Sequence, residues 1–319
     1  MEFRTHTFHF PADYDGPVIA TLFEAPRPTA DNGRAVLYIH GYIDYFFQEH
    51  LAEHFVARGY RFYAVELRKY GRSWLEGQHP DFARSMYEYY PDLTESIRFI
   101  QAAGASEIIL LGHSTGGLLA ALYADDGPAD QRRAIRRVVL NSPFLEFNTT
   151  WTKRHIQIPL AAAASLIFPF LHARNELSPL YAQSVHRHYR GEWDFDTQLK
   201  PIEGIPLYFS WLRAVRNGQQ RIKRGLNIAV PVLVMSSDRS YFGTGWDDAL
   251  FRTDAVLNVE DIRRYAPNLG RDVTYVPIAG GMHDLFLSSA PVRAEAFRTM
   301  FEWLDRTLPA ATSDRTNID

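Results

Sequence analysis

Short runs of consecutive apolar residues alternate along most of the chain with longer segments in which apolar residues recur every three or four positions. The short runs predict strands buried on both faces, and the longer segments predict helices with one apolar side. The predicted strands cover residues 35–40, 61–67, 107–111, 136–141, 230–236 and 272–278. The predicted helices cover residues 45–58, 117–124 and 291–308, and two more begin near Pro91 and Asn258. This alternation predicts an α/β fold with a mostly parallel central sheet and helices on both faces.

Two parts of the chain depart from this alternation. Residues 3–10 and 17–24 have the character of strands and flank a turn-like segment, so they predict an antiparallel hairpin ahead of the parallel sheet. Residues 142–227 show no strand–helix alternation, and we expect this segment to be an insertion that covers the carboxyl edge of the sheet. The predicted organisation is a core of residues 1–141 and 228–310, an inserted cap of residues 142–227 and a frayed polar tail of residues 311–319.

The sequence Gly-His-Ser-Thr-Gly-Gly, at residues 112–117, lies between a predicted strand and a predicted helix. It contains the pattern G-x-S-x-G, in which a serine side chain is exposed on a sharp turn between a strand and a helix. Gly112 and Gly116 have no Cβ, so the strand and helix backbones can approach each other. Ser114 is therefore a candidate nucleophile. The alternative is that its hydroxyl only caps the helix.

A serine nucleophile needs a base within hydrogen-bond reach and a third group that orients the base. His283 follows the last predicted strand on a glycine-rich loop, so we expect it at the same edge of the sheet as Ser114; the alternative is a histidine on a surface loop. His113 is expected to point away from Ser114. An acid is expected before the histidine in the sequence, and both Asp238 and Asp254 are candidates.

The chain resembles the α/β-hydrolase superfamily, in particular its serine hydrolases of the lysophospholipase, monoacylglycerol lipase and serine aminopeptidase-like branch. The segments that carry the resemblance occur in the order of the family and span nearly the whole chain apart from the insertion. They are residues 40–42, 59–73, 110–117, 231–237, 254–260 and 280–288. The resemblance implies the α/β-hydrolase fold with an inserted cap, and a Ser-His-Asp triad.

The resemblance also implies which residues complete the site. Its spacing favours Asp254, which stands 29 positions before His283, over Asp238, which stands 45 positions before it. An oxyanion hole needs two backbone N–H donors. One is expected from Thr115, which follows the nucleophile, and the resemblance implies Tyr42 as the other.

The sequence departs from the family in two loops. Residues 66–73 keep Arg68, Gly71 and Ser73 of the pattern D-x-R-G-x-G-x-S but lack its first glycine. We expect this change to alter a structural loop rather than the chemistry. The choice of Asp254 also requires residues 236–253 to be an inserted loop.

Composition narrows the classes of function. The net charge of -3 and the isoelectric point near 6.5 give no general attraction to nucleic acid. The chain has no cysteine, which excludes disulfides, thiolate metal sites and cysteine nucleophiles. The sequence contains no P-loop, zinc-ligand spacing or dinucleotide fingerprint, so neither a cofactor nor a metal is expected.

Two apolar features of the sequence bear on where the protein is found in the cell. The N-terminal residues lack the apolar core of a secretory signal, and the longest apolar stretch, residues 158–171, is too short to span a bilayer. We therefore expect a cytoplasmic protein without a transmembrane segment, with weak membrane-surface contact through the cap as a further hypothesis. The oligomeric state is left open.

The predicted function is hydrolysis of a small-molecule carboxylic ester with a hydrophobic, lipid-like acyl group, through the triad and an acyl-enzyme. Aromatic residues in the insertion favour such a substrate, although they could equally form the core of the cap. One alternative keeps the triad and cleaves a peptide or amide bond, as in an aminopeptidase, with Glu176, Glu192 or Asp194 binding the substrate ammonium. A second alternative is a catalytically silent ligand receptor or scaffold.

Overall fold

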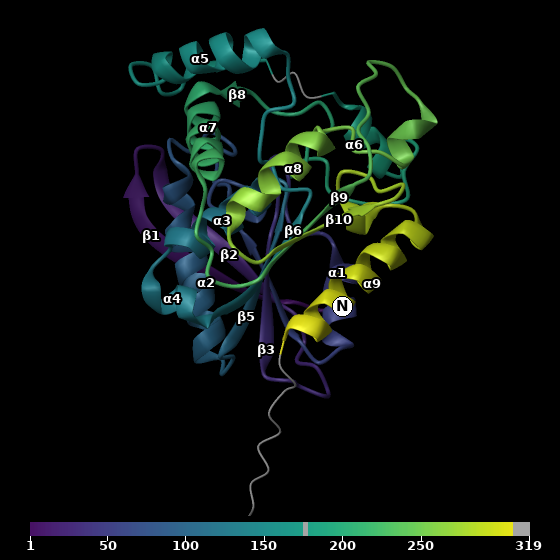
Figure 1. Ribbon diagram of the computed structural model, residues 1–319. Coiled ribbons are helices and arrows are strands. Elements are labelled where there is room, and N and C mark those ends of the chain that lie inside the picture. The colour runs from purple at the N-terminus through teal and green to yellow at the C-terminus, as the bar shows by residue number, and fades with distance from the viewer. Residues whose placement is uncertain (175–177, 309–319) are drawn as a thin grey trace, which may run out of the picture.

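The computed structural model describes residues 1–174 and 178–308, and its centre is an eight-stranded sheet with the order β1-β2-β4-β3-β5-β6-β9-β10 (Figure 1). The pairs β1–β2 and β2–β4 are antiparallel, and every other neighbouring pair is parallel. The strands are β1 (Arg4–Asp13), β2 (Gly16–Glu24), β3 (Arg34–Ile39), β4 (Arg61–Glu66), β5 (Glu107–His113), β6 (Ile135–Asn141), β9 (Val232–Ser237) and β10 (Val273–Ile278). The predicted hairpin and the mostly parallel sheet are both confirmed.

Helices connect the parallel strands. The α-helices are α1 (Glu49–Val56), α2 (Tyr90–Ala102), α3 (Thr115–Asp126), α4 (Ala129–Ala134), α5 (Ile158–Ala164), α6 (Leu180–Val185), α7 (Phe209–Arg224), α8 (Val259–Tyr265) and α9 (Ala290–Thr307). Short turns of 3-10 helix cover Gly71–Ser73, Met86–Tyr89, Asp248–Phe251, Ala266–Leu269 and Leu285–Leu287, and a π-helical turn covers Lys153–Gln157. The sequence pattern predicts the helices beside the sheet but not α4, α5, α6 or α7.

The side chains of the central strands alternate between two hydrophobic clusters, one on each face of the sheet. Leu37 and Ile39 of β3 belong to the cluster that includes α2, α3 and α7. Val36 and Tyr38 of the same strand belong to the cluster that includes α1 and α9. The apolar runs are therefore continuous because both faces are covered, and the predicted placement of helices on both faces is confirmed.

The chain between β6 and β9 contributes no strand to the central sheet in its described part. It contains α5, α6, α7 and a two-stranded sheet of β7 (His172–Ala173) and β8 (Leu207–Tyr208). Figure 1 shows α5 lying across the top of the molecule, above α7. Trp211, Val215 and Ile222 of α7 join the same hydrophobic cluster as α3. This segment is thus packed onto the body of the fold rather than tethered beside it. Its assignment as a cap stays a prediction, and the predicted tail lies outside the described residues.

The helix predicted to begin near Asn258 is α8. Asn258 is its N-cap, and the Asn258 side chain accepts the N–H of Glu260 at 3.1 Å. Asp261, in the first turn, lies 3.1 Å from Arg154. This ion pair joins the start of α8 to the segment of residues 142–227.

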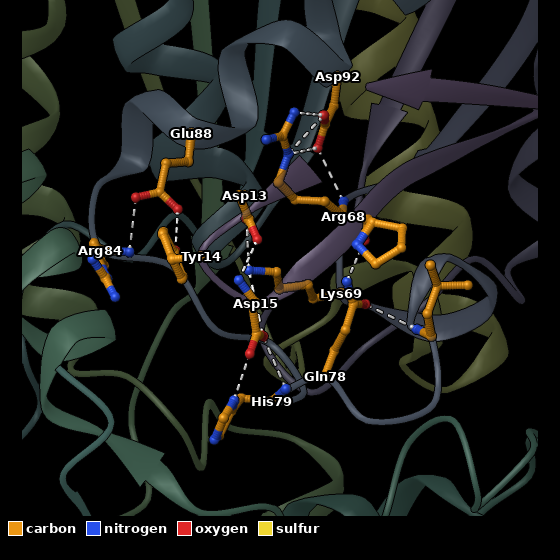
Figure 2. Close-up of polar contacts among 12 residues, drawn as sticks. Asp13, Tyr14, Asp15, Arg68, Lys69, Gln78, His79, Arg84, Glu88 and Asp92 are labelled. Carbon is orange, nitrogen blue, oxygen red and sulfur yellow. Dashed lines mark hydrogen bonds and ion pairs between the residues drawn. The ribbon is translucent and has the colours of Figure 1, made fainter. Parts of the chain in front are cut away.

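The loop after β4 departs from the family pattern at Lys69, whose backbone has a left-handed φ of 65°. Glycine adopts this conformation more readily than other residues, which explains the glycine of the family pattern. The Lys69 side chain is buried, and its Nζ lies 2.8 Å from Asp13 Oδ2 and 3.5 Å from Asp15 Oδ2 (Figure 2). The lysine thereby ties this loop to the end of the β1–β2 hairpin.

Replacement of Lys69 by methionine should lower the free energy of unfolding by about 3 kcal/mol, because it leaves the carboxylates of Asp13 and Asp15 without their buried ammonium partner. Chemical denaturation at neutral pH measures the loss. As a control, Arg298→Met removes an exposed cation from salt bridges on α9 and should cost much less, because water screens those pairs. Equal losses in the two variants would contradict the structural role of Lys69.

Candidate active site

Ser114 lies on a sharp turn between the end of β5 and the start of α3. Its backbone has a φ of 53° and a ψ of -118°, a strained combination for a residue with a side chain. The side chain makes no capping hydrogen bond to α3, so the interpretation of Ser114 as a hydroxyl cap is wrong. The main chain holds the turn instead, because the Ser114 N–H donates to Asn141 O at 3.0 Å and Ser114 O accepts from the Phe144 N–H at 3.0 Å.

Two glycines make this turn sterically possible. A Cβ on Gly112 would lie 2.4 Å from Gly116 O, and a Cβ on Gly116 would lie 2.3 Å from His40 O. Both distances are far shorter than any real contact of a Cβ atom. The strand that precedes Ser114, the helix that follows it and the end of β3 therefore approach each other at a distance that only glycine allows.

His283 lies on the loop after β10 and lines the same cavity as Ser114. Its Nδ1 is 2.9 Å from Asp254 Oδ2. The other carboxylate oxygen of Asp254 accepts the N–H groups of Val256 and Leu257, both at 2.8 Å, so the fully buried acid is held from three sides. Because Nδ1 is bonded to the carboxylate, Nε2 is the ring nitrogen left to exchange a proton with a nucleophile.

Asp238, the other candidate acid, faces different partners. Its Oδ2 is 3.0 Å from Arg239 Nη2, and its Oδ1 accepts the N–H of Gly280 at 3.0 Å. The chain after Asp238 returns to Asp254, where the Tyr241 N–H donates to Asp254 O at 2.8 Å. The acid that meets the histidine is thus Asp254, and Asp238 fastens the loop that leads to His283.

A cavity of about 720 Å³ contains the candidate nucleophile, base and oxyanion donors. Its lining includes Ser114, His283, Tyr42 and Thr115. Thr115 is the first residue of α3, so its N–H has no acceptor within the helix. The ring of Tyr42 stacks on Trp211 of α7 with 3.9 Å between the ring centroids, which fixes the loop of Tyr42 against that helix.

A buried neutral histidine holds the start of the Tyr42 loop. His40 Nδ1 lies 2.8 Å from Gly41 O, and His40 Nε2 accepts the Leu67 N–H at 3.1 Å. These two partners require one protonated and one bare ring nitrogen, with the proton on Nδ1. Burial also lowers the pKa of His40 and so favours this neutral form. The ring joins the loop after β3 to the loop after β4.

A buried carboxyl group holds the other side of the same loop. The N–H of Ile43, whose φ is 49°, donates to Asp81 Oδ2 at 2.8 Å. Burial raises the pKa of Asp81 well above its ordinary value, and the nearby Asp44 raises it further. The Asp81 N–H in turn donates to Lys69 O at 2.9 Å. The loop that carries Tyr42 and Ile43 extends into residues 45–48, which the sequence pattern assigns to a helix. The helix α1 therefore begins only at Glu49.

A buried network that sequence analysis missed ties the loop of His283, the candidate base, to the turn of Ser114, the candidate nucleophile. Asn141, whose carbonyl accepts the Ser114 N–H, donates through Nδ2 to Asp284 Oδ1 at 2.7 Å. Asp284 follows His283 directly, and its N–H donates to Tyr181 Oη at 3.0 Å. The Tyr181 ring stands edge-on to the His283 ring, with 5.5 Å between centroids. The available signals were the position of Asn141 at the end of a strand and the adjacency of Asp284 to the base.

The expectation that His113 points away from Ser114 stays a prediction, but the His113 ring lies beside that of His283. His113 lines the cavity, its ring centroid lies 4.8 Å from that of His283, and its Nδ1 is 3.2 Å from Asn141 O. Burial lowers the pKa of His113, which favours the neutral ring beside the base. Although several histidines gather here, no group of His, Cys, Asp and Glu within residues 1–174 and 178–308 could hold a metal ion.

Sequence comparison identifies the family of the chain. A family model described as serine aminopeptidase, S33, matches residues 30–289. The chain belongs to this family. The matched residues extend from the approach to β3 to the end of the loop that carries His283, and they include Ser114 and Asp254. A search of curated proteins finds no significant match.

Solved structures share the fold of this S33-family chain. The monoacylglycerol lipase of Paleococcus ferrophilus is 21% identical with a TM-score of 0.66, over 97% of this chain and 100% of that one. A soluble variant of monoglyceride lipase from Saccharomyces cerevisiae, in complex with a substrate analogue, is 16% identical with a TM-score of 0.65, over 96% and 97%. Est1E from Butyrivibrio proteoclasticus, with bound ferulic acid, is 15% identical with a TM-score of 0.56, over 94% and 98%. The chain thus has the α/β-hydrolase fold over nearly all of its length.

Asp81→Asn should leave the protein at least as stable as the wild type at neutral pH, because asparagine keeps an oxygen for the Ile43 N–H and cannot ionise. In the wild type the pKa of Asp81 is raised by folding, so the stability that its neutral form contributes is lost as the pH rises toward that pKa. Denaturation between about pH 4 and pH 8 should show a smaller loss with rising pH in the asparagine variant.

Asp81→Ala removes the acceptor of the Ile43 N–H and should cost about 1–3 kcal/mol. It is the comparison for the asparagine variant in the same denaturation series. If asparagine and alanine destabilised the protein equally, the hydrogen bond to Ile43 would not be what holds this loop.

Proposed function

We propose that this chain is an esterase that cleaves hydrophobic carboxylic esters through a Ser114–His283–Asp254 triad. The observation that carries the proposal is the 2.9 Å contact between His283 Nδ1 and Asp254 Oδ2, at a cavity that Ser114 and His283 both line. The strained turn at Ser114 also supports the proposal, because a sharp turn between a strand and a helix exposes the serine hydroxyl of a nucleophile elbow, and backbone strain is concentrated at active sites.

In the proposed reaction, Ser114 Oγ attacks the ester carbonyl while His283 Nε2 accepts the serine proton. The N–H groups of Tyr42 and Thr115 donate to the resulting oxyanion, and each such donor is commonly worth about 3 kcal/mol. His283 then gives the proton to the leaving alcohol. Water, deprotonated by the same ring, hydrolyses the acyl-enzyme and restores Ser114, while Asp254 stabilises the imidazolium in both half-reactions.

The lining of the cavity supports an apolar acyl group as the substrate. Its apolar members come from the segment of residues 142–227 and from the loop before α8, and they include Phe144, Phe147, Ile158, Ile202, Leu207, Phe209, Leu212, Val256 and Leu257. The charged members of the described lining are Asp44, Lys153, Arg174 and Lys200. A volume of about 720 Å³ suits a ligand of moderate size held mainly by apolar contacts.

Cleavage of a peptide bond beside a free ammonium group is the second candidate, because the family is described as serine aminopeptidase. It has less support from the acids expected to bind that ammonium. Glu192 and Asp194 are exposed and do not line the cavity, and Asp194 lies 3.5 Å from Arg187. Glu176 lies outside the described residues. A catalytically silent receptor has no observation in its favour.

Substitution of the triad tests the proposed function. Ser114→Ala should lower kcat for p-nitrophenyl acyl esters by about a million-fold. Asp254→Asn should lower it by about ten-thousand-fold, because the wrong tautomer of His283 is then favoured. Asp238→Asn is the matched control, since it keeps an acceptor for Gly280, and it should stay within about threefold of the wild type. Steady-state kinetics that showed the larger loss for Asp238→Asn would contradict the assignment of the acid.

We further propose that residues 142–227 form a cap over the cavity and that its exposed apolar side chains contact a membrane surface. These side chains are Trp151, Leu160, Leu166, Ile167 and Phe168, whose exposed fractions lie between 61% and 75%. Ile158 and Ala161, in the same part of the chain, line the cavity. In the described parts of the chain, no helix is long and apolar enough to cross a membrane. Surface contact would bring the cavity close to acyl chains held in a bilayer.

The double substitution Ile167→Ser and Phe168→Ser should reduce flotation with phospholipid vesicles by about tenfold or more, because it removes two exposed apolar side chains from the contact. The double substitution Trp74→Ser and Tyr87→Ser is the control, since both side chains are large and exposed but lie outside residues 142–227. A wild-type protein that did not float with vesicles would overturn the membrane contact and leave the esterase proposal intact.

A further inference from the structure

A buried ion pair lines the cavity beside the proposed oxyanion loop. Lys200 Nζ is 2.6 Å from Asp44 Oδ1, and the two side chains are only 10% and 3% exposed. Asp44 lies on the loop that carries Tyr42, whereas Lys200 belongs to the segment proposed as the cap. Both residues line the cavity together with Ser114, so the pair joins core and cap at the place where substrate would bind.

The surroundings of the pair keep both charges in place. Lys200 Nζ lies 5.2 Å from the centroid of the Phe47 ring and 5.5 Å from that of Phe195, so two aromatic rings flank the ammonium. Burial alone would raise the pKa of Asp44, but the adjacent Lys200 ammonium brings that pKa below its ordinary value. Asp44 is therefore ionised at neutral pH, and Lys200 balances its charge.

The pair bears on specificity because Asp44 is the one acidic residue in the described lining of the cavity. A substrate ammonium that entered a largely apolar cavity would need a carboxylate, since an unpaired buried cation is strongly disfavoured. Lys200 already supplies the ammonium that Asp44 can bind. A second cation would meet a carboxylate that is occupied and a lysine that repels it.

We propose that the Asp44–Lys200 pair is a specificity determinant that excludes acyl groups carrying an ammonium group. The inference rests on the proposed esterase function and deepens it, because it names a substrate class that the site rejects. Lys200 holds the position that the ammonium of an aminoacyl substrate would take at Asp44. Neutral acyl groups have no such competitor, so the pair directs this member of a serine aminopeptidase family toward uncharged esters.

Matched esters that differ only in charge test the proposal. The pairs are the p-nitrophenyl esters of alanine and isobutyric acid, and those of ε-aminocaproic and heptanoic acid, in which an ammonium group replaces a methyl group. The readout is the ratio of kcat/KM for the charged ester to that for the neutral one, at a pH where the amine is protonated. The two chain lengths cover a near and a far position of the ammonium relative to Ser114.

In the wild type this ratio should be far below one for both pairs. Lys200→Met frees the carboxylate and should raise the ratio for at least one pair by about tenfold or more. The double substitution Asp44→Asn with Lys200→Met should bring the ratio back down, which would assign the gain to the carboxylate. Lys223→Met, which breaks a lysine pair with Glu146 away from the cavity, is the matched control and should leave the ratio unchanged.

An unchanged ratio in a folded Lys200→Met variant, or a wild type that prefers the charged esters, would overturn the proposal. Calorimetric binding of n-butylammonium and n-butanol tests the ion pair without catalysis. The wild type should bind the alcohol more tightly, Lys200→Met should reverse this order, and tighter binding of butylammonium by the wild type would also overturn the proposal. If the wild type did not hydrolyse neutral esters at all, the esterase function would be refuted. The binding of n-butylammonium and n-butanol would still decide the role of Lys200.

Discussion

The close backbone approach around Ser114 is the constraint on which the rest of the site depends. A Cβ on Gly116 would lie 2.3 Å from His40 O, so the loop after β3 packs directly behind the turn that carries the nucleophile. Ser114, the start of α3 and the loop of Tyr42 are therefore packed against one another through their backbones. Because backbone atoms set this arrangement, it can direct N–H groups at a developing oxyanion without any reorganisation during the reaction.

Around this unit, three buried acids are each stabilised in a different way. Asp254 accepts three hydrogen bonds, one of them from His283. Asp44 is paired with the Lys200 ammonium, whereas Asp81 has a raised pKa and accepts an N–H. Buried ionisable groups are expensive unless they are paired, bonded or neutral. The site uses all three solutions. Asp254 holds the loop of His283, whereas Asp44 and Asp81 both hold the loop that carries Tyr42.

The fold could be predicted from sequence wherever a local pattern reflects burial. The runs that became β3, β5 and β9 are mostly apolar because both faces of the sheet are covered, and the apolar stripe of α9 faces one of those clusters. The short helices α5 and α6 escaped prediction because their side chains are mostly exposed or partly buried, so no clear periodicity marks them.

The sequence could predict only those site residues that come directly after a predicted strand. Ser114 and His283 stand on glycine-containing loops at strand ends, which placed both at one edge of the sheet. The choice between Asp238 and Asp254 depends on the path of the intervening loop, which family resemblance indicated and spacing alone did not. Contacts such as Asp44 with Lys200 join residues 156 positions apart, so no local pattern could reveal them.

Reaction with a fluorophosphonate, followed by peptide mapping, tests whether Ser114 is a nucleophile activated by His283. The native protein should acquire one phosphonyl group, on Ser114, and His283→Ala should slow the labelling by several orders of magnitude because the serine then lacks its base. Labelling of another residue, or labelling of Ser114 at an unchanged rate in His283→Ala, would contradict this role of Ser114.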